Sequence, residues 1–180
     1  MPNDRKESVL APQVHESVFV AEGARIYGDV EIRENASVWF NAVIRGDEGK
    51  VSIGRNTNLQ DNVVIHSDFF VATEIGDNVT VGHGAILRGC KIGNNVMIGM
   101  HSTVMTGAEI GENSMVAANC LVPYGSKFPP RSLILGTPAK RVRELTEEET
   151  RANAVAIQIY LDLIPKYRDH VIGGFDRSPR

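Results

Sequence analysis

The sequence predicts an all-β solenoid followed by one C-terminal α-helix. The main observation is an aliphatic residue at every sixth position, a period that neither a helix nor a plain strand alternation produces. The four runs are Val20, Ile26, Ile32, Val38 and Ile44; Ile53, Leu59 and Ile65; Ile75, Val81 and Leu87; and Ile92, Ile98, Val104, Ile110, Val116 and Val122. Short repeats of this kind are typical of solenoids, in which each coil buries its inner face against its neighbours.

The residues between the aliphatic positions support the same interpretation. Glycine often follows the aliphatic residue, as in Ile53-Gly54, and a small residue often stands four positions on, as Ala85 does after Val81. Three such sides would make a triangular coil of about eighteen residues, stacked at roughly 4.8 Å per coil. This is the hexapeptide-repeat pattern of the left-handed parallel β-helix, a fold that departs from the usual right-handed crossover rule.

The repeats divide the chain into four segments. We expect a lead-in segment over residues 1–17, the left-handed β-helix over 18–145, a C-terminal helix over 146–169 and a mobile tail over 170–180. The start of the helix is indicated by Thr146, a favourable N-cap residue, and by the three glutamates that follow it.

Two interruptions of the repeat predict excursions from the coils. The stretch RGDEGK separates Ile44 from Ile53, and HSDFFVATE separates Ile65 from Ile75. Insertions into a solenoid map to its corners and frequently build functional sites.

Composition argues against several classes of partner. The net charge is −3 and the pI about 6.0, so there is no electrostatic case for nucleic acid or an anionic membrane. No apolar stretch approaches the ~20 residues needed to span a bilayer, and the N-terminus lacks a signal-peptide core. These features predict a cytoplasmic protein without a nucleic-acid or membrane partner. Cys90 and Cys120 stand in inward small-residue positions and are expected to fill the core.

Three histidines lie within the repeats, namely His66, His83 and His101. His66 and Arg88 each directly follow an inward aliphatic residue, so both should take the same outward position on one side of the solenoid. His83 belongs to the preceding side of its coil. Because one subunit cannot easily bring different sides together, we expect any site that uses both sides to lie between two subunits.

Four motifs resemble the hallmarks of the gamma-class carbonic anhydrases. They are AVIRGD at 42–47, NLQDNVVIH at 58–66, VGHGAILRGC at 81–90 and LGTPAKRVREL at 135–145. The resemblance implies a homotrimer with zinc between adjacent subunits, where zinc-bound hydroxide hydrates carbon dioxide to bicarbonate. It also implies that His66 is one zinc ligand and that His83 is the ligand donated by the neighbouring subunit.

The same resemblance suggests five further site residues. It places Arg45 and Asp47 as a pair near the metal, Gln60 beside the metal-bound water, and Asn58 and Asp61 alongside. Arginines and carboxylates at solenoid corners also often stabilise an oligomer, so a structural role is expected first for Arg45 and Asp47.

One departure from the family pattern concerns the metal directly. The third ligand of the family falls five residues after His83, and this chain has Arg88 there. Arginine stays protonated and does not ligate zinc. A guanidinium about 4 Å from a divalent cation would cost on the order of 8 kcal/mol at an effective dielectric near 20. His101 is a possible replacement, because His66, His83 and His101 would supply the three ligands of a catalytic zinc. The alternative, a surface His101 that touches no metal, stays open.

Three functions are compatible with these observations. The first is a carbonic anhydrase-type lyase, which AVIRGD and NLQDN favour. The second is a hexapeptide-repeat acyltransferase that uses coenzyme A, with His83 as general base. The third is a non-catalytic homologue, in which His66, His83 and Arg88 hold an anion such as bicarbonate, or in which the trimer serves as an assembly subunit.

Overall fold

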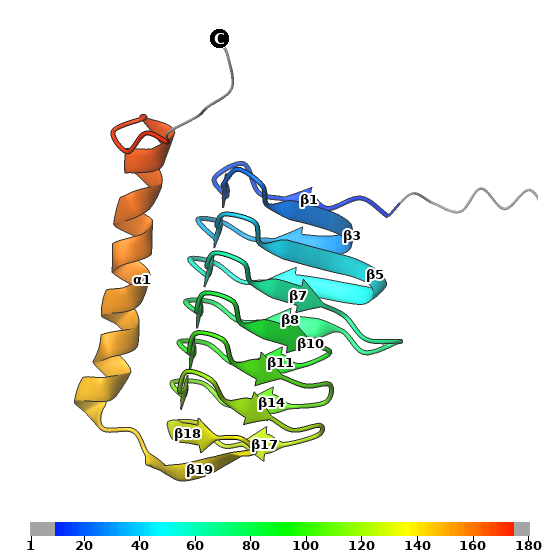
Figure 1. Ribbon diagram of the computed structural model, residues 1–180, viewed down its shortest axis with the longest axis vertical. Coiled ribbons are helices and arrows are strands. Elements are labelled where there is room, and N and C mark those ends of the chain that lie inside the picture. The colour runs from blue at the N-terminus through cyan, green and yellow to red at the C-terminus, as the bar shows by residue number, and fades with distance from the viewer. Residues whose placement is uncertain (1–9, 175–180) are drawn as a thin grey trace, which may run out of the picture.

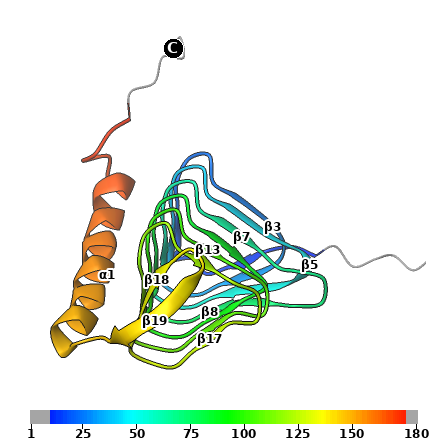
Figure 2. The same cartoon turned by 60° about the horizontal axis from the view of Figure 1, so that its bottom comes forward.

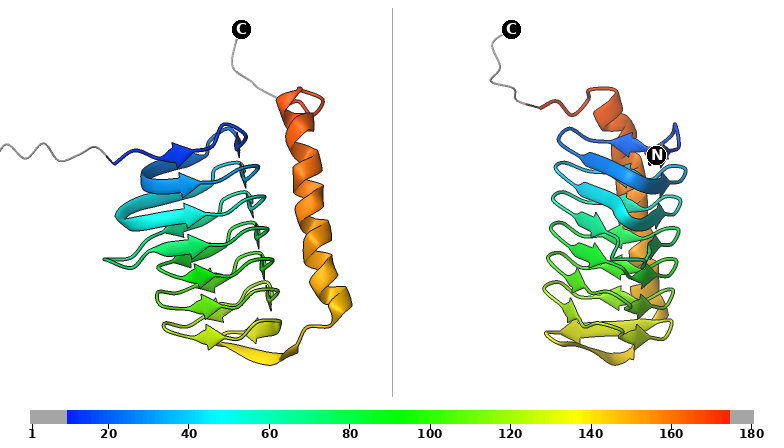
Figure 3. Two further views of the ribbon diagram at one scale, coloured as in Figure 1. Left: turned by 180° about the vertical axis from the view of Figure 1, so that it is seen from behind. Right: turned by 90° about the vertical axis from the view of Figure 1, so that its right-hand side faces the viewer.

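A computed structural model describes residues 10–174 and confirms the left-handed parallel β-helix. Its coils stack along one axis, and Figure 2 shows their triangular outline. The helix α1 (Glu147–Arg168) lies beside the stack and runs back along it toward the first coils (Figures 1 and 3). Residues 1–9 and 175–180, which belong to the predicted lead-in and tail, lie outside the described range.

The strands form two mainly parallel sheets that together cover three sides of the triangle. The first sheet contains β1 (Gln13–Val14), β3 (Arg25–Ile32), β5 (Val43–Ile53), β7 (Val64–His66), β8 (Thr73–Ile75), β10 (Ile86–Arg88), β11 (Lys91–Ile92), β13 (Thr103–Val104), β14 (Glu109–Ile110), β16 (Leu121–Val122) and β17 (Lys127–Phe128). The second contains β2 (Phe19–Val20), β4 (Ser37–Val38), β6 (Asn58–Leu59), β9 (Thr80–Val81), β12 (Met97–Ile98), β15 (Met115–Val116), β18 (Ser132–Gly136) and β19 (Ala139–Glu144). Because β3 and β5 continue around a corner, the first sheet covers two sides.

The six-residue spacing sets the register of the coils, as predicted. Ile44 pairs with Ile65, and Ile65 pairs with Leu87 in the next coil. All three side chains are fully buried, because each points into the hollow of its coil. Cys90 and Cys120 are buried free thiols, as expected for core residues, and burial raises the pKa of Cys90 to about 12.

Each side of the triangle has its own outer surface. We call the side formed by β7, β10, β13 and β16 the histidine side, because it carries His66. The charged side, formed by β8, β11, β14 and β17, shows ion pairs between successive coils, such as Glu74–Lys91 at 3.3 Å and Glu109–Lys127 at 2.9 Å. The second sheet forms the helix side, along which α1 lies (Figure 1).

The helix is fixed at its start and along its length. Thr146 caps it: the Thr146 hydroxyl accepts a hydrogen bond from the Glu149 backbone, and the Glu149 carboxylate accepts one from the Thr146 backbone. Further along, buried Asn153 donates to a backbone carbonyl of a coil at 2.8 Å. Trp39 packs edge-on against Tyr160, with ring centroids 5.1 Å apart. Within residues 10–174, no helix is long and apolar enough to cross a membrane.

The first coil begins before residue 18. Gln13 and Val14 of β1 pair with β3, so they already belong to the solenoid although they fall within the predicted lead-in.

Candidate functional site

The column of outward side chains through His66 is the centre of the site. In three successive coils, Arg45, His66 and Arg88 occupy the same register position on the histidine side. Each follows a buried aliphatic residue, so each points outward, and the predicted shared position of His66 and Arg88 is confirmed.

His66 is held by an acidic residue of the preceding coil. Its Nε2 lies 2.8 Å from Asp47 Oδ1 and 3.9 Å from Glu48 Oε2. Asp47 also pairs with Arg45. The hydrogen bond from His66 is the main reason that the pKa of Asp47 is lowered. The Arg45–Asp47 pair is therefore made within one chain, and it fixes the carboxylate that holds His66.

Arg88 is paired with carboxylates of its own chain. Its Nη2 donates to Asp68 Oδ1 at 2.9 Å and approaches Glu48 Oε2 at 3.5 Å. Asp68 in turn accepts a hydrogen bond from the Thr106 hydroxyl, which is the largest cause of its lowered pKa. The Nε of Arg88 is buried and finds no hydrogen-bond partner among the described residues.

The balance of charge around this column bears on the anion-binding hypothesis. The two guanidiniums of Arg45 and Arg88 face three carboxylates, those of Asp47, Glu48 and Asp68. Arg88 is thus already neutralised within the chain. An incoming anion would have to displace a carboxylate, so this arrangement weakens the interpretation in which Arg88 binds bicarbonate.

His83 has different surroundings on the helix side of its coil. Its Nδ1 lies 3.0 Å from Asp61 Oδ2, and its backbone N–H donates to Gln60 Oε1 at 3.2 Å. The carboxylate beside Nδ1 favours the tautomer with the proton on that nitrogen, which leaves the lone pair on Nε2. The hydroxyl of Tyr160 on α1 lies 3.5 Å from Nε2.

Asn58 and Gln60 form a buried chain of amides beneath His83. Gln60 Nε2 donates to Asn58 Oδ1 at 3.2 Å, and Asn58 Nδ2 donates to Thr80 Oγ1 at 2.9 Å. Both ends of the Gln60 amide are therefore engaged within the chain. In a single chain, these residues support the backbone and the position of His83.

His101 lies one coil beyond His83 and one residue further on, as the repeat predicts. Its backbone N–H donates to the His83 carbonyl at 2.9 Å. Its φ of 56° is left-handed, like that of Asn62 and Asn119 at the equivalent corners. The ring lies against Gly84, where a Cβ atom would come within 2.5 Å of His101 Nδ1. The smallness of Gly84 thus leaves room for the imidazole.

The donor set does not fit a three-histidine zinc site of the family type. Arg88 stands where the resemblance places the third ligand, its guanidinium is bound by Asp68, and its buried Nε is a donor that would oppose a cation. Within residues 10–174 of one chain, no three His, Cys, Asp or Glu side chains are grouped to hold a metal. His66 and His83 lie on different sides of the solenoid, so a joint site would need a second copy.

Four contact residues were not anticipated. Glu48 and Asp68 lie in the two interruptions of the repeat, which were predicted to leave the coils as loops. The second is a loop, whereas Glu48 belongs to the continuous strand β5. Thr106 lies opposite Gly89 in the next coil, so counting along the repeat could have found it. Tyr160 comes from α1, and no local pattern links it to His83.

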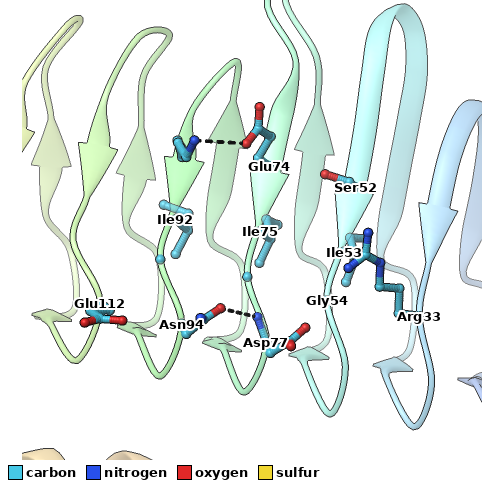
Figure 4. Close-up of a pocket in the computed structure, with 13 residues that line it drawn as sticks. Arg33, Ser52, Ile53, Gly54, Glu74, Ile75, Asp77, Ile92, Asn94 and Glu112 are labelled. Atoms are coloured by element: carbon cyan, nitrogen blue, oxygen red, sulfur yellow. Dashed lines mark hydrogen bonds and ion pairs between the residues drawn. The ribbon is translucent and has the colours of Figure 1, made fainter.

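The hollow in Figure 4 lies on another part of the surface, where the charged side meets a corner. Its floor follows a column of glycines, including Gly54, Gly76 and Gly93. A Cβ atom on Gly76 would lie 2.9 Å from the carbonyl carbon of Gly93. Close stacking of the coils therefore requires these glycines, and the hollow contains none of the predicted site residues.

The chain resembles known proteins in sequence. The family model described as bacterial transferase hexapeptide (six repeats) matches residues 89–123. A "Probable carbonic anhydrase" of Methanocaldococcus jannaschii is 58% identical over 139 residues, which are 77% of this chain and 87% of that protein. Gamma carbonic anhydrase 2 of Arabidopsis thaliana, a mitochondrial protein, is 38% identical over 85% of this chain and 57% of its own length. A carbonic anhydrase of Geobacillus kaustophilus is 49% identical over 78% of this chain and 77% of its own length.

Solved structures resemble the fold. A hexapeptide transferase family protein from Anaplasma phagocytophilum has a TM-score of 0.84 and 42% identity, covering 88% of this chain and 93% of that one. An N-acyltransferase from Bacillus cereus, solved with dTDP and coenzyme A, has a TM-score of 0.62 over 82% of this chain and 88% of that one. At 14% identity, the second likeness concerns the fold alone.

Proposed function

Because the chain belongs to the gamma-class carbonic anhydrase family, we propose that it acts on carbon dioxide and bicarbonate as a cytoplasmic homotrimer. The names of its carbonic anhydrase relatives imply a metal cofactor, without specifying the metal. The single observation that supports the proposal is the pair of histidines, each fixed by its own carboxylate: His66 by Asp47 and His83 by Asp61. In the proposed site, His66 of one subunit faces His83 of the next.

Each residue of the site then has a defined task. Asp61 lies at Nδ1 of His83, so Nε2 is the ring nitrogen that can face the neighbouring subunit. Gln60 fixes the His83 backbone, and Asn58 fixes Gln60. On the opposite wall, Arg45 holds Asp47 and Asp47 holds His66. These contacts preorganise both imidazoles before a second subunit arrives.

Arg88 limits the chemistry of the proposed site. We expect the natural protein to bind far less than one zinc per subunit and to hydrate carbon dioxide slowly. Arg88→His supplies an imidazole in place of the guanidinium and removes its positive charge. The variant should bind about one zinc per subunit and hydrate carbon dioxide at least about tenfold faster.

The test compares metal content and stopped-flow hydration of carbon dioxide in untagged protein. Arg55→His, which adds a histidine at an exposed position paired with Glu34, is the control for non-specific zinc binding. A variant Arg88→His with unchanged zinc content and rate would show that this position is not at the metal. If neither the natural protein nor the Arg88→His variant hydrates carbon dioxide or binds bicarbonate, the proposed substrate is wrong. His101→Asn enters the same assay, because loss of zinc from that variant would support the predicted ligand role of His101.

The acyltransferase hypothesis is favoured by the match to the bacterial transferase hexapeptide model and by the similarity to a hexapeptide transferase family protein at 42% identity. Coenzyme A should then stabilise the protein against thermal unfolding, by about 2.7 kcal/mol at a hundredfold excess over its Kd. Under the proposal above, coenzyme A leaves the unfolding temperature unchanged.

A further inference from the structure

A buried hydroxyl closes the loop that follows His66. The loop of residues 67–72 leaves the solenoid after β7 and returns at Thr73, the first residue of β8 (Figure 1). Thr73 is fully buried, although most of the side chains that fill the coils are aliphatic. Its Oγ1 donates to the His66 carbonyl at 2.6 Å. The residue that follows the loop is therefore bonded to the residue that precedes it.

The same hydroxyl also reaches the next coil. Thr73 Oγ1 accepts a hydrogen bond from the Gly89 backbone N–H at 2.8 Å, and that N–H also donates to the His66 carbonyl at 3.1 Å. Gly89 directly follows Arg88, and Arg88 is paired in register with His66. One buried side chain thus joins the backbone at His66 to the backbone beside Arg88.

The strands end at this corner, so the sheet alone does not fix the backbone there. β7 ends at His66 and β10 ends at Arg88. Buried backbone groups need hydrogen-bond partners, and Thr73 supplies one for a carbonyl and one for an N–H. Gly89 is also confined on another side, because a Cβ atom there would lie 2.9 Å from Thr106 Cγ2 and 3.0 Å from Asp68 Cβ. Loss of the Thr73 hydroxyl would therefore loosen one of the two contacts that place Gly89.

A second buried hydroxyl at the same corner makes no such bonds. Ser67 directly follows His66 and is fully buried, and its Oγ has no hydrogen-bond partner among the described residues. The two hydroxyls lie near the same stretch of backbone and differ in what they bind. Ser67 is therefore the matched comparison for Thr73.

We propose that Thr73 is a positioning residue of the candidate site, and that its hydroxyl sets where the His66 imidazole lies relative to the side chain at position 88. Thr73 acts through the backbone, because its hydroxyl contacts the His66 carbonyl and the Gly89 N–H rather than either side chain. The inference rests on the proposed function, since the position of His66 affects the reaction only if His66 belongs to the site. Displacing a reacting group by about 1 Å can lower a rate a hundredfold.

The test replaces Thr73 in the full chain and follows the ring nitrogens of His66 by nuclear magnetic resonance. Thr73→Val keeps the shape of the side chain without the hydroxyl. It should shift the His66 ring signals and speed the hydrogen exchange of the Gly89 amide by about tenfold. Thr73→Ser keeps the hydroxyl and should resemble the natural protein. Thr73→Ala should act like Thr73→Val, and it places no methyl group beside the His66 carbonyl if the valine does not fit.

Two controls separate the position of His66 from the stability of the fold. Ser67→Ala removes the hydroxyl that makes no bond and should leave the His66 signals unchanged. Ile134→Val removes one buried methylene group from the last coils. It should lower the temperature of unfolding without moving the His66 signals.

Three results would overturn the inference: unchanged His66 signals in both Thr73→Val and Thr73→Ala, a shift as large in Thr73→Ser, or a shift as large in Ser67→Ala or Ile134→Val. The proposed function is read separately, from hydration of carbon dioxide by Arg88→His. Shifted His66 signals in Thr73→Val, without any hydration by Arg88→His, would contradict that function and leave the role of Thr73 standing. Hydration that is equally fast when Thr73→Val is added to Arg88→His would contradict the role of Thr73 and leave the function standing.

Discussion

The two halves of the proposed site are built differently. Around His83, Asp61 holds Nδ1 and leaves Nε2 facing a single hydroxyl, that of Tyr160. Around His66, Nε2 itself is bound by Asp47, and the next coil contributes Arg88 rather than a second imidazole. The His83 half is thus ready to donate a lone pair, whereas the His66 half is saturated with ion pairs.

This contrast shows that backbone position does not determine chemistry. His66 and Arg88 share one register position on the same sheet, and both point outward. The partners differ because β5, which carries Glu48, and the loop between β7 and β8, which carries Asp68, bring carboxylates beside these side chains. The same outward position of this fold can therefore carry different chemistry when a neighbouring segment supplies a carboxylate.

Removing the carboxylate behind His83 is the largest expected effect. In the Arg88→His background, Asp61→Ala should lower zinc affinity by about tenfold to a hundredfold, because the imidazole loses the partner that fixes its tautomer. Zinc titration measures the affinity, and the imidazole nitrogen chemical shifts report the tautomer of His83 without any metal.

Asp47→Ala is the matched variant on the other half. It frees His66 Nε2, so it should lower zinc affinity less than Asp61→Ala does. Equal losses of zinc affinity in Asp47→Ala and Asp61→Ala would contradict the distinction between the His83 half, which can donate a lone pair, and the His66 half, which is occupied by ion pairs.

The inward-facing residues could be predicted from the sequence, and the loop contacts could not. Six-residue counting places His66 beside Arg88 and His101 one coil beyond His83, because buried aliphatic residues hold each coil in register. Counting along the six-residue repeat does not predict the contact of Asp68 with Arg88, because the loop that carries Asp68 departs from the repeat before it returns to Arg88. The contact of Tyr160 with His83 depends on how α1 packs against the coils, which no local spacing encodes.

A smaller effect is expected from the hydroxyl that faces His83. Burial, together with the nearby Asp61 carboxylate, raises the pKa of Tyr160 to about 12, so the phenol stays protonated at neutral pH. As a donor, it competes with a metal for the Nε2 lone pair. Tyr160→Phe should therefore raise the zinc affinity of the Arg88→His variant by about twofold to tenfold. Tyr167→Phe, in the same aromatic cluster, is the control, and a lower affinity in Tyr160→Phe would mean that the hydroxyl supports His83.

The smallest expected effect is the response of the protein to low pH. We expect this response in α1 and in the His83 half of the site, and not in the His66 half. The hydrogen bond from Arg143 is the main cause that lowers the pKa of Glu149 from 4.5 to about 2. Because the folded pKa is the lower one, this carboxylate stabilises the start of α1 fully above pH 4.5, and the stabilisation is lost as the pH falls toward 2. Trp39, the only tryptophan, packs against α1, so its fluorescence should change over that interval.

Glu149→Gln tests the origin of this acid response. It removes the titrating carboxylate while keeping an amide that can still complete the capping box. The variant should start with a less stable helix at neutral pH and lose most of the fluorescence change between pH 4.5 and 2. Nuclear magnetic resonance signals of the loop at 67–72 should stay the same in both proteins at pH 7, because α1 and this loop lie on opposite sides of the solenoid. If the loop signals shift with the helix, the two halves of the site are coupled through the coils and cannot be treated as independent.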